Sequence, residues 1–315
     1  MIIFKYLFLV GLLAACAALP PTHVRATIED DQWPLSEVAK GVFVHQAVVQ
    51  ESAAANQGDI ANIGFIVGSK CVAVVDSGGS LVVGKKLRAA ISRVTPLPVC
   101  YVINTHVHPD HIFGNAAFNA DRPAFIGHAK LPLAMATRAQ NYLNAIKRVL
   151  GEAADGSVIV APTQTLTDTL ELDLGGRKLA LRAWRTAHTD NDVTVFDETS
   201  GTLWLSDLLF IGHTPVLDGN LTGWLVVMNE LRGIKATTVI PGHGAVQKNW
   251  PAAADNQQRY LESLLAETRL MLRNRKTIQQ AVETVGIGER DNWLLFDTFH
   301  KRNVTTAFAQ LEWEE

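Results

Sequence analysis

The sequence predicts an α/β fold built around a metal site. Short apolar runs typical of buried strands alternate with longer amphipathic segments typical of helices along most of the 315 residues. One apolar run leads directly into a segment where three histidines and an aspartate lie within six residues. No Pro/Ser-rich linker or run of like charges divides the chain, so residues 27–315 are expected to form one domain.

Composition limits the classes of function. The chain has 48% hydrophobic and 19% charged residues, which is ordinary for a globular protein with a sizeable core. Its formal net charge of −3 provides no basic surface for phosphate backbones, which argues against nucleic acid as a partner. A small-molecule substrate is expected instead, and the sequence identifies no protein partner.

Residues 1–26 are predicted to be a signal peptide. The apolar stretch Leu7–Ala15 is too short for a membrane span, which needs about 20 residues. The four residues ending at Cys16 resemble a bacterial lipobox, which would make Cys16 the lipidated first residue of a lipoprotein. The alternative is cleavage after Ala17 or Ala26, which releases a soluble protein. Both alternatives predict an exported, periplasmic protein, held to a membrane only through a lipid on Cys16.

The first half of the domain is expected to combine a hairpin with a β-α-β unit. Branched apolar runs predict strands, and the turn Asp76–Gly79 introduces an amphipathic helix. In chain order we expect strands over Val42–Gln50 and Ile60–Val67 around the loop Glu51–Asp59, a strand over Cys71–Val75, a helix over Val82–Val94, strands over Val99–Asn104 and Ala124–Gly127, and a helix over Lys130–Leu150.

The second half is expected to be richer in strands and to end in helices. Gly175 and Gly176 predict a turn between two alternating runs. The expected strands are Thr165–Leu174, Lys178–Arg185, Val193–Phe196, Leu203–Leu205 and Thr237–Ile240, and the expected helices are Trp224–Gly233, Asp255–Arg275, Ile278–Glu283 and Val304–Trp313.

Two cysteines remain after the N-terminal segment. Cys71 and Cys100 each open a strand-like run, and the helix between these runs predicts neighbouring parallel strands. In an oxidising compartment the two could form a disulfide. The alternative is a pair of buried free thiols that pack as small hydrophobic groups.

The residue types in Thr105–His111 predict a metal site. On an extended segment, residues two apart point to the same side, so His106 and His108 can bind one ion together. Asp110 and His111 then turn toward a second ion nearby. Mixed imidazole and carboxylate ligands suit zinc. A polar loop with coincidental histidines is the alternative, and the density of ligand residues argues against it.

Three further ligand candidates stand at the ends of predicted strands, namely His188, Asp207 and His243. Strand ends on one edge of a sheet converge in space, however far apart they lie in the sequence. We therefore expect these residues to complete the site that the histidine segment begins.

In this order the seven residues resemble the ligand pattern of the metallo-β-lactamase superfamily. The flanking segments Ser206–Phe210 and Pro241–Gly244 fit the same pattern. Within the superfamily, the chain is most similar to the quinoprotein relay system zinc metallohydrolase group. That similarity rests on Tyr101–Asn104, Ile112–Phe118, Gly212–Gly219 and Arg302–Thr305.

The resemblance implies an αβ/βα sandwich, in which two mixed β-sheets pack face to face with helices on the outer faces. It also implies two zinc ions per chain. The first would be held by His106, His108 and His188, and the second by Asp110, His111 and His243. Asp207 would bridge the two, and chemistry supports this role because two neighbouring cations need an anion between them.

Such a site predicts a hydrolase. A water held between two zinc ions loses its proton near neutral pH, and the resulting hydroxide is expected to attack the carbonyl of an ester, thioester or amide. Asp110 is the expected catalytic residue, which orients the nucleophile and passes a proton to the leaving group. The sequence does not identify the substrate.

Two alternatives to this interpretation stay open. The first is β-lactam hydrolysis, against which Asp207 stands where the best-known subclass has a zinc-binding cysteine. In addition, no Lys or Arg occurs in Leu208–Gly219 to bind a lactam carboxylate. The second is an iron-dependent redox enzyme or a non-catalytic metal-binding protein of the same fold, so iron stays open beside zinc.

Two residues near the expected ligands have two interpretations each. His213 follows Asp207 in the next loop and either contacts substrate or supports the ligands. Asp76 either hydrogen-bonds a zinc-binding histidine or caps the next helix.

Other polar and aromatic residues are assigned simpler roles. His45 and His300 are expected to be structural or surface groups, and His128 a helix cap. Trp224 and the loop Glu51–Asp59 are candidate substrate walls, with core packing and a plain solvent loop as the alternatives. The basic residues Arg290, Lys301 and Arg302 either meet an anionic substrate or lie on solvated helix faces.

Overall fold

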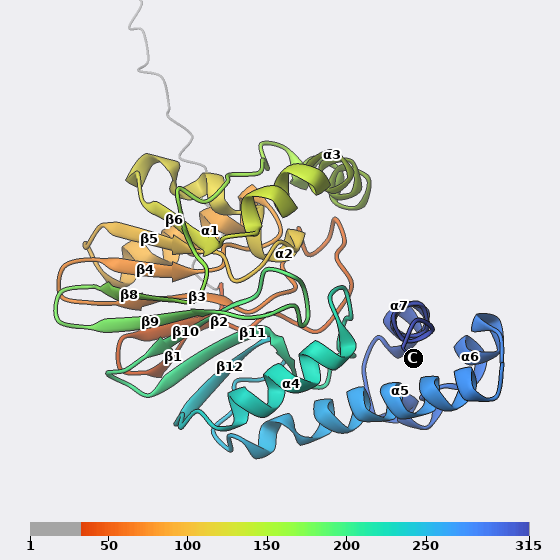
Figure 1. Cartoon of the computed structure of the whole chain (residues 1–315). Coiled ribbons are helices and arrows are strands. Elements are labelled where there is room, and N and C mark those ends of the chain that lie inside the picture. The colour runs from red at the N-terminus through yellow and green to blue at the C-terminus, as the bar shows by residue number, and fades with distance from the viewer. Residues whose placement is uncertain (1–32, 315) are drawn as a thin grey trace, which may run out of the picture. The chain divides into compact units, whose positions relative to one another are not determined.

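The computed structural model describes residues 33–314 of the chain (Figure 1). The predicted signal peptide and the lipobox at Cys16 lie outside this range. Within residues 33–314, no helix is both long enough and apolar enough to cross a membrane.

Seven strands form the first sheet. They consist largely of branched and aromatic residues, which pack well on a pleated surface. Their spatial order follows the chain: β1 (Ser36–Ala39), β2 (Val42–His45), β3 (Ile63–Val67), β4 (Val72–Val75), β5 (Val99–Ile103), β6 (Ala124–His128) and β7 (Gln164–Leu166). Pairs from β1 to β4 are antiparallel, and pairs from β4 to β7 are parallel.

Five strands form the second sheet, in the spatial order β12-β11-β10-β9-β8. Their bounds are β8 (Thr169–Asp173), β9 (Lys178–Ala183), β10 (Val193–Asp197), β11 (Thr202–Phe210) and β12 (Thr238–His243). Only the β11 and β12 pair is parallel, which makes this sheet mixed as well.

The two sheets pack face to face around a shared apolar core. Ile103 of the first sheet and Trp204 of the second belong to the same cluster of buried side chains, and neither is more than 1% exposed. Strand β4 shows how alternation divides the two faces: Ala73 points into this cluster, whereas Val74 points to the opposite side of the sheet. The fold predicted for the chain, an αβ/βα sandwich, is confirmed.

Helices cover the outer faces (Figure 1). Helix α1 packs Val83 and Leu87 on the outer face of the first sheet, and Ser80 caps its N-terminus. Helices α4, α5 and α7 share a core with the outer face of the second sheet. The helices are α1 (Leu81–Val94), α2 (Pro109–Ile112), α3 (Leu131–Leu150), α4 (Leu221–Arg232), α5 (Asp255–Arg273), α6 (Ile278–Thr284) and α7 (Phe296–Leu311), with 3-10 helices over Asn115–Asp121, Gly151–Ala154, Ala252–Ala254 and Ile287–Asn292.

The predicted strand Thr165–Leu174 is wrong, because this segment forms two strands in different sheets. Strand β7 ends the first sheet at Leu166, and β8 begins the second at Thr169. Alternation continues through both strands, so the pattern carries no mark of the change of sheet. The hairpin of β8 and β9 around Gly175 and Gly176 does form as expected.

Other boundaries also differ from the prediction. Strand β1 was not expected, β2 ends at His45 rather than Gln50, and β11 continues past Leu205 to Phe210. The last helix begins at Phe296, eight residues before the expected Val304. Its first turns matter for function because they reach the candidate site described below.

The structure joins Cys71 and Cys100 in a disulfide, with their Cα atoms 5.8 Å apart. Cys100 lies in β5 and Cys71 directly precedes β4, and these strands are parallel neighbours, as expected. The bond therefore ties together the two strands that lead to Asp76 and to the histidine segment.

Candidate metal centre

The histidine segment begins where β5 ends. His106 and His108 follow this strand, and His108 occupies the N-cap position of the short helix α2. Pro109 takes the first helical position, where its fixed φ angle favours a helix start. This single turn brings Asp110 and His111 round to the same side of the sheet edge.

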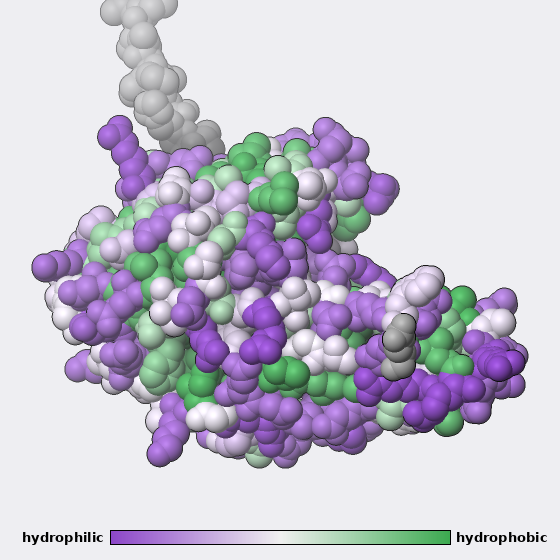
Figure 2. All heavy atoms as spheres, viewed as in Figure 1, coloured by the Kyte–Doolittle hydropathy of each residue, from purple (hydrophilic) through white to green (hydrophobic). Residues whose placement is uncertain are grey.

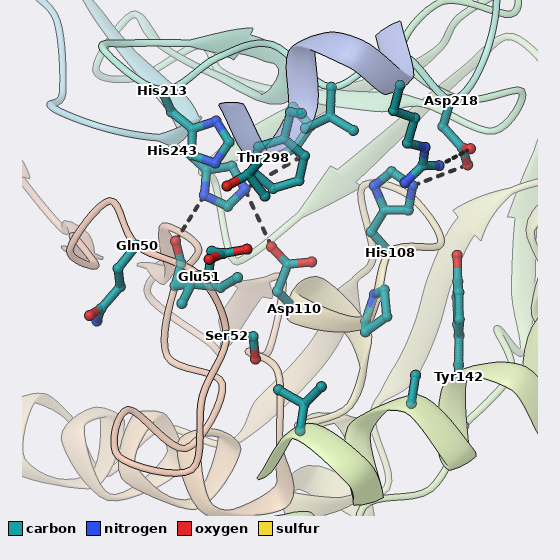
Figure 3. Close-up of a pocket in the computed structure, with 18 of the residues that line it drawn as sticks. Gln50, Glu51, Ser52, His108, Asp110, Tyr142, His213, Asp218, His243 and Thr298 are labelled. Atoms are coloured by element: carbon teal, nitrogen blue, oxygen red, sulfur yellow. Dashed lines mark hydrogen bonds and ion pairs between the residues drawn. The ribbon is translucent and has the colours of Figure 1, made fainter. Parts of the chain in front are cut away.

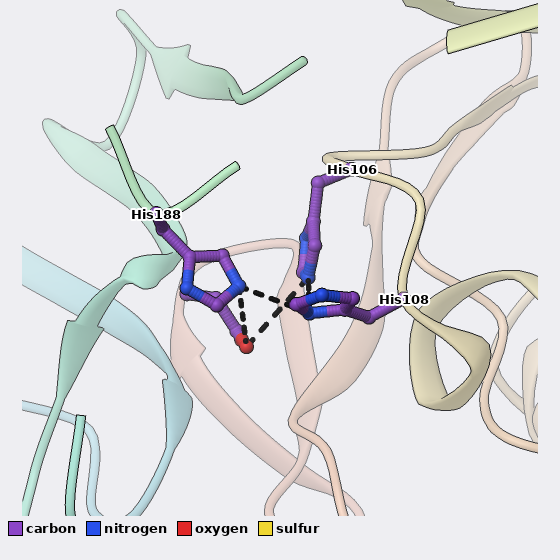
Figure 4. A group of neighbouring side chains, drawn as sticks. His106, His108 and His188 are labelled. Carbon is purple, nitrogen blue, oxygen red and sulfur yellow. Dashed lines mark hydrogen bonds and ion pairs between the residues drawn. The ribbon is translucent and has the colours of Figure 1, made fainter. Parts of the chain in front are cut away.

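Three imidazoles meet in a first group (Figure 4). Nε2 of His106 lies 3.1 Å from Nδ1 of His108, and Nε2 of His188 lies 3.0 Å from the same Nδ1. His188 arrives on the loop after β9. That loop is held by Asp192, which accepts hydrogen bonds from the amide and hydroxyl of Thr189.

A second group adjoins the first. Oδ2 of Asp110 lies 3.4 Å from Nε2 of His111 and 3.3 Å from Nε2 of His243, the last residue of β12. The ligand atoms within each of the two groups lie within 4.8 Å of one another.

Asp207 stands between the two groups. Its Oδ1 lies 3.2 Å from Nε2 of His111, and its Oδ2 lies 3.4 Å from Nε2 of His188 and 3.6 Å from Nε2 of His106 and of His243. The two oxygens of one carboxylate thus face both ligand groups.

Local backbone geometry places this carboxylate. We expected Asp207 at a strand end, but it lies inside β11. Ser206, directly before it, has a positive φ of 48°, and the pairing of β11 with β12 shifts register at Ser206. Gly242 on β12 is in contact with Asp207, and a Cβ at that position would overlap the carboxylate oxygen. The glycine beside His243 therefore makes room for Asp207.

Two buried polar atoms show that the site suits a metal. Nε2 of His111 and Oδ1 of Asp207 lie 3.2 Å apart but form no hydrogen bond with each other, and within the described part of the chain neither of these buried atoms has another hydrogen-bond partner. Leaving such a group unsatisfied costs about 1–3 kcal/mol. Both atoms point into the ligand groups, and their chemistry, imidazole nitrogen and carboxylate oxygen, is the kind that zinc binds. The residues present fit a metal site.

The second ring nitrogen of each ligand imidazole has a partner of its own. Such contacts fix ring orientation and tautomer in metal sites. The pairs are His106 Nδ1 with Oγ1 of Thr105 at 3.0 Å, His108 Nε2 with Oδ2 of Asp218 at 3.2 Å, His111 Nδ1 with Oδ2 of Asp76 at 2.9 Å, His188 Nδ1 with the carbonyl of Val216 at 2.6 Å, and His243 Nδ1 with the carbonyl of Ile60 at 2.8 Å.

Of the two interpretations of Asp76, the structure supports the one in which it hydrogen-bonds a ligand histidine. Asp76 is fully buried and accepts hydrogen bonds from His111 and from the amide and hydroxyl of Thr105. Ser80, not Asp76, caps α1. This carboxylate therefore links the end of β4 to the histidine segment.

Burial and neighbouring charges set the protonation of the first group. Burial, helped by neighbouring histidines and opposed by Asp207, lowers the pKa of His106 well below its usual value and that of His188 to about 3. Both rings are therefore neutral at pH 7, the form in which imidazole binds a metal.

The second group favours positive charge. Burial opposes the charge on Asp207 and on Asp110, but the adjacent histidines outweigh it and hold both pKa values well below the usual range. Burial likewise opposes a charged His243, yet Asp207 and Asp110 raise its pKa to about 9. Two carboxylates thus create a strongly cation-attracting position beside His111 and His243.

A pocket of about 550 Å³ opens onto both ligand groups (Figure 3). Its floor includes His108, Asp110, Asp207 and His243. Its walls come from the loop before β3, from α3, from the loop after β11 and from α7. The wall residues are Gln50, Glu51, Ser52, Ile60, Pro109, Arg138, Tyr142, Ala145, Val149, His213, Val216, Asp218, Thr298, Phe299 and Arg302.

Several predicted substrate contacts do lie in this wall. His213 is in the pocket lining, with its ring 4.8 Å from that of His243, and burial lowers its pKa to about 4. Glu51 and Arg302 also line the pocket, whereas Arg290 and Lys301 are not among the described residues that line it. Trp224 is fully buried in the core with its ring 5.3 Å from that of His188, so its role is packing.

The other histidines of residues 33–314 are structural, as expected. His45 stacks on Trp33 and contacts Asp59, and His300 contacts Tyr260 in the helical core. His128 accepts a hydrogen bond from the amide of Lys130 directly before α3.

Sequence reasoning missed three ionisable wall residues. Asp218, Arg138 and Tyr142 all line the pocket, and burial raises the pKa of Tyr142 to about 12, so its hydroxyl stays protonated. Arg138 and Tyr142 are spaced four apart on a predicted helix, which places them on one face, but only the tertiary structure shows where that face points.

The family described as the metallo-beta-lactamase superfamily matches residues 56–243, more than half of the chain. The chain belongs to this superfamily. The matched segment begins before β3, ends at His243 and contains all seven ligand candidates. Helices α5, α6 and α7 follow it.

One curated relative and two solved structures show how far the similarity extends. The linear primary-alkylsulfatase of Pseudomonas sp. (strain ATCC 19151) is 23% identical over 208 residues, covering 54% of this chain and 39% of the relative. The chain therefore matches well under half the length of that enzyme. A metallo-beta-lactamase from Pontibacter korlensis has a TM-score of 0.59 at 17% identity, covering 73% of this chain and 99% of its own. TMB-1 has a TM-score of 0.57 at 17% identity, covering 73% and 96%. These two structures support the superfamily fold.

Proposed function

We propose that this superfamily hydrolase is an exported dinuclear zinc enzyme of the quinoprotein relay system group. We further propose that it cleaves an ester, thioester or amide bond at the carbonyl carbon. The position of Asp207 carries the dinuclear part of the proposal, because its two oxygens face two separate ligand groups. In this proposal the first group is His106, His108 and His188, and the second is Asp110, His111 and His243.

Two bound zinc ions would supply a water acidified to near-neutral pKa and would polarise the scissile carbonyl. Charge compensation and proton transfer would come from the chain's own residues. Asp207 offsets positive charge between the groups, and Asp110, on the pocket floor, accepts a proton from the nucleophile and delivers it to the leaving group. The apolar part of the wall, including Ile60, Val149 and Phe299, would position the substrate.

Sulfate-ester hydrolysis is a second candidate. The curated relative is named as a linear primary-alkylsulfatase, and the pocket of this chain holds two arginines, which suit an anion. β-Lactam hydrolysis stays a third candidate. We still find no Lys or Arg in Leu208–Gly219, although Arg138 and Arg302 reach the pocket from other elements.

An activity screen and a metal analysis test the proposal together. The protein would be purified without added metal, its metal content measured by plasma mass spectrometry, and the zinc-loaded form assayed against matched thioesters, esters, lactones, lactams and alkyl sulfates. About two zinc ions per chain and clear turnover of a carbonyl substrate are expected. Iron with a visible absorption band would overturn the zinc assignment, and turnover of alkyl sulfates alone would replace the carbonyl substrate with a sulfate ester.

Export is tested separately. Expression of the full chain in a Gram-negative host, followed by fractionation and mass measurement, should yield a processed periplasmic protein. A mass that includes diacylglycerol on Cys16 would select the lipoprotein alternative. An unprocessed cytoplasmic chain would contradict export.

A further inference from the structure

The pocket carries two arginines that hydrolysis at the metal ligands does not require. Arg138 on α3 and Arg302 on α7 line the same pocket as His108. They converge on Asp218, whose Oδ1 accepts a hydrogen bond from Nη2 of Arg302 at 2.7 Å and whose Oδ2 lies 3.8 Å from Nη2 of Arg138. Figure 3 shows Asp218 above His108 at one side of the pocket.

The charges at this point do not balance. A single carboxylate, Asp218, faces two guanidinium groups and also contacts Nε2 of His108 at 3.2 Å. The 3.8 Å separation from Arg138 is too long for a hydrogen bond. The side chains of Arg138 and Arg302 are 35% and 56% exposed. Within residues 33–314 the hydrogen bond from Arg302 to Asp218 is the one formed by either guanidinium, so further N–H donors are left to meet a ligand.

The same face of α3 changes from cationic to apolar along the pocket. Arg138, Tyr142, Ala145 and Val149 are spaced i, i+4, i+7 and i+11, which places them on one side of a helix, and all four line the pocket. At 1.5 Å per residue this face is about 16 Å long. Ile60 and Phe299 add further apolar surface to the pocket.

We propose that Arg138 and Arg302 form an anion-binding subsite and that the substrate is an amphiphile, with one oxyanion group at these arginines and an apolar body along α3. The proposal deepens the proposed hydrolase function and rests on it for turnover, although anion binding can be measured without turnover. Carboxylate, sulfate and sulfonate groups share the required chemistry, since each offers two oxygens to a planar guanidinium.

Calorimetric titration of the zinc-loaded protein tests the subsite. The probes are octane-1-sulfonate, octanoate and octan-1-ol, which share a chain length and differ in the head group. We expect both anions to bind at least tenfold more tightly than the alcohol. Arg138→Gln and Arg302→Gln should each weaken sulfonate binding by about tenfold, the value of one charge-assisted hydrogen-bond pair. Arg290→Gln is the matched control, because Arg290 pairs with Asp297 outside the pocket lining.

The outcomes separate the subsite from simple metal binding and from misfolding. Zinc content and thermal unfolding are measured for each variant, and Arg138→Lys and Arg302→Lys, which keep the charge, should retain part of the affinity lost in the Gln variants. The subsite would be overturned if the anions and the alcohol bind with equal affinity. It would also be overturned if both Gln variants bind the sulfonate within twofold of the wild-type affinity. Loss of sulfonate binding in the Gln variants of a protein that hydrolyses none of the assayed substrates would support the subsite and contradict the hydrolase.

Discussion

The ligand cluster and the pocket wall of this protein are built in opposite ways. His106, His111 and His188 are at most 1% exposed, and each ring is fixed by a partner at its second nitrogen. In the wall, by contrast, Arg302 is 56% exposed and comes from a helix beyond the segment that matches the superfamily. The ligand cluster is rigid and lies inside the segment that matches the superfamily, whereas part of the pocket wall, including Arg302, lies outside it. We expect the wall, rather than the cluster, to determine which substrate is selected.

Burial explains the difference. A metal site needs ligands fixed closely in position, and burial with hydrogen bonds supplies that order. A pocket wall needs only shape and charge, which exposed side chains on helices can provide and change without disturbing the core.

Removing the shared carboxylate should have the largest effect. Asp207→Ala leaves the two ligand groups without the anion that faces both, so we expect at most one retained metal and a loss of activity of roughly 10³-fold. Metal content after dialysis and turnover of the substrate found by screening would measure both. Two metals and a normal rate in this variant would remove the bridging role.

Asp110→Asn should separate catalysis from metal binding. The amide keeps an oxygen in place but cannot accept a proton, so kcat should fall by about 10²-fold while most of the metal is retained. Steady-state kinetics with metal analysis of the same sample would test this. If kcat stays within threefold, proton transfer belongs to another group.

Asp76→Asn tests whether the outer contacts of the cluster matter. Asp76 is not itself a ligand candidate but orients His111, so the variant should weaken metal affinity by about 10- to 100-fold, as measured by competition with a chelator. Asp197→Asn is a matched control, because Asp197 is also a fully buried carboxylate but pairs with Arg177 and belongs to neither ligand group. Equal effects of the two variants would mean that Asp76 acts only on stability.

A wall residue should behave differently. Tyr142→Phe removes one hydroxyl from the pocket and leaves every ligand contact intact, so metal content should be unchanged and KM should rise about two- to tenfold. A changed metal content would show that the pocket wall and the ligand cluster are coupled, which would contradict the contrast drawn between them.

Loss of the disulfide should lower the stability of the fold and leave the catalytic rate nearly unchanged. Replacing Cys71 and Cys100 by Ser should lower the free energy of unfolding by about 3–4 kcal/mol for a bridge that spans 29 residues. The rate at 25 °C should change least of all. Denaturant unfolding with and without the bridge would measure the effect, and an unchanged unfolding midpoint would indicate that the bond does not form in solution.

Much of the cluster can be read from the sequence because local rules govern it. The segment His106–His111 carries four ligand candidates in a fixed spacing after a strand, and strand-end positions predict that His188 and His243 join it. Where local rules carry no information, prediction failed: nothing in Thr165–Leu174 shows that the chain changes sheet, because alternation fits either sheet equally.

By itself, the sequence determined the α/β class, the superfamily resemblance and the identity of the ligand candidates, because these depend on residue type and spacing. Only the tertiary structure decided that Asp207 lies within a strand and still faces both groups, that Asp76 serves His111, and that Arg138 and Arg302 meet at Asp218. Those contacts join residues from different helices and sheets, and their relative placement follows from the packing of whole elements, which spacing along one chain does not encode.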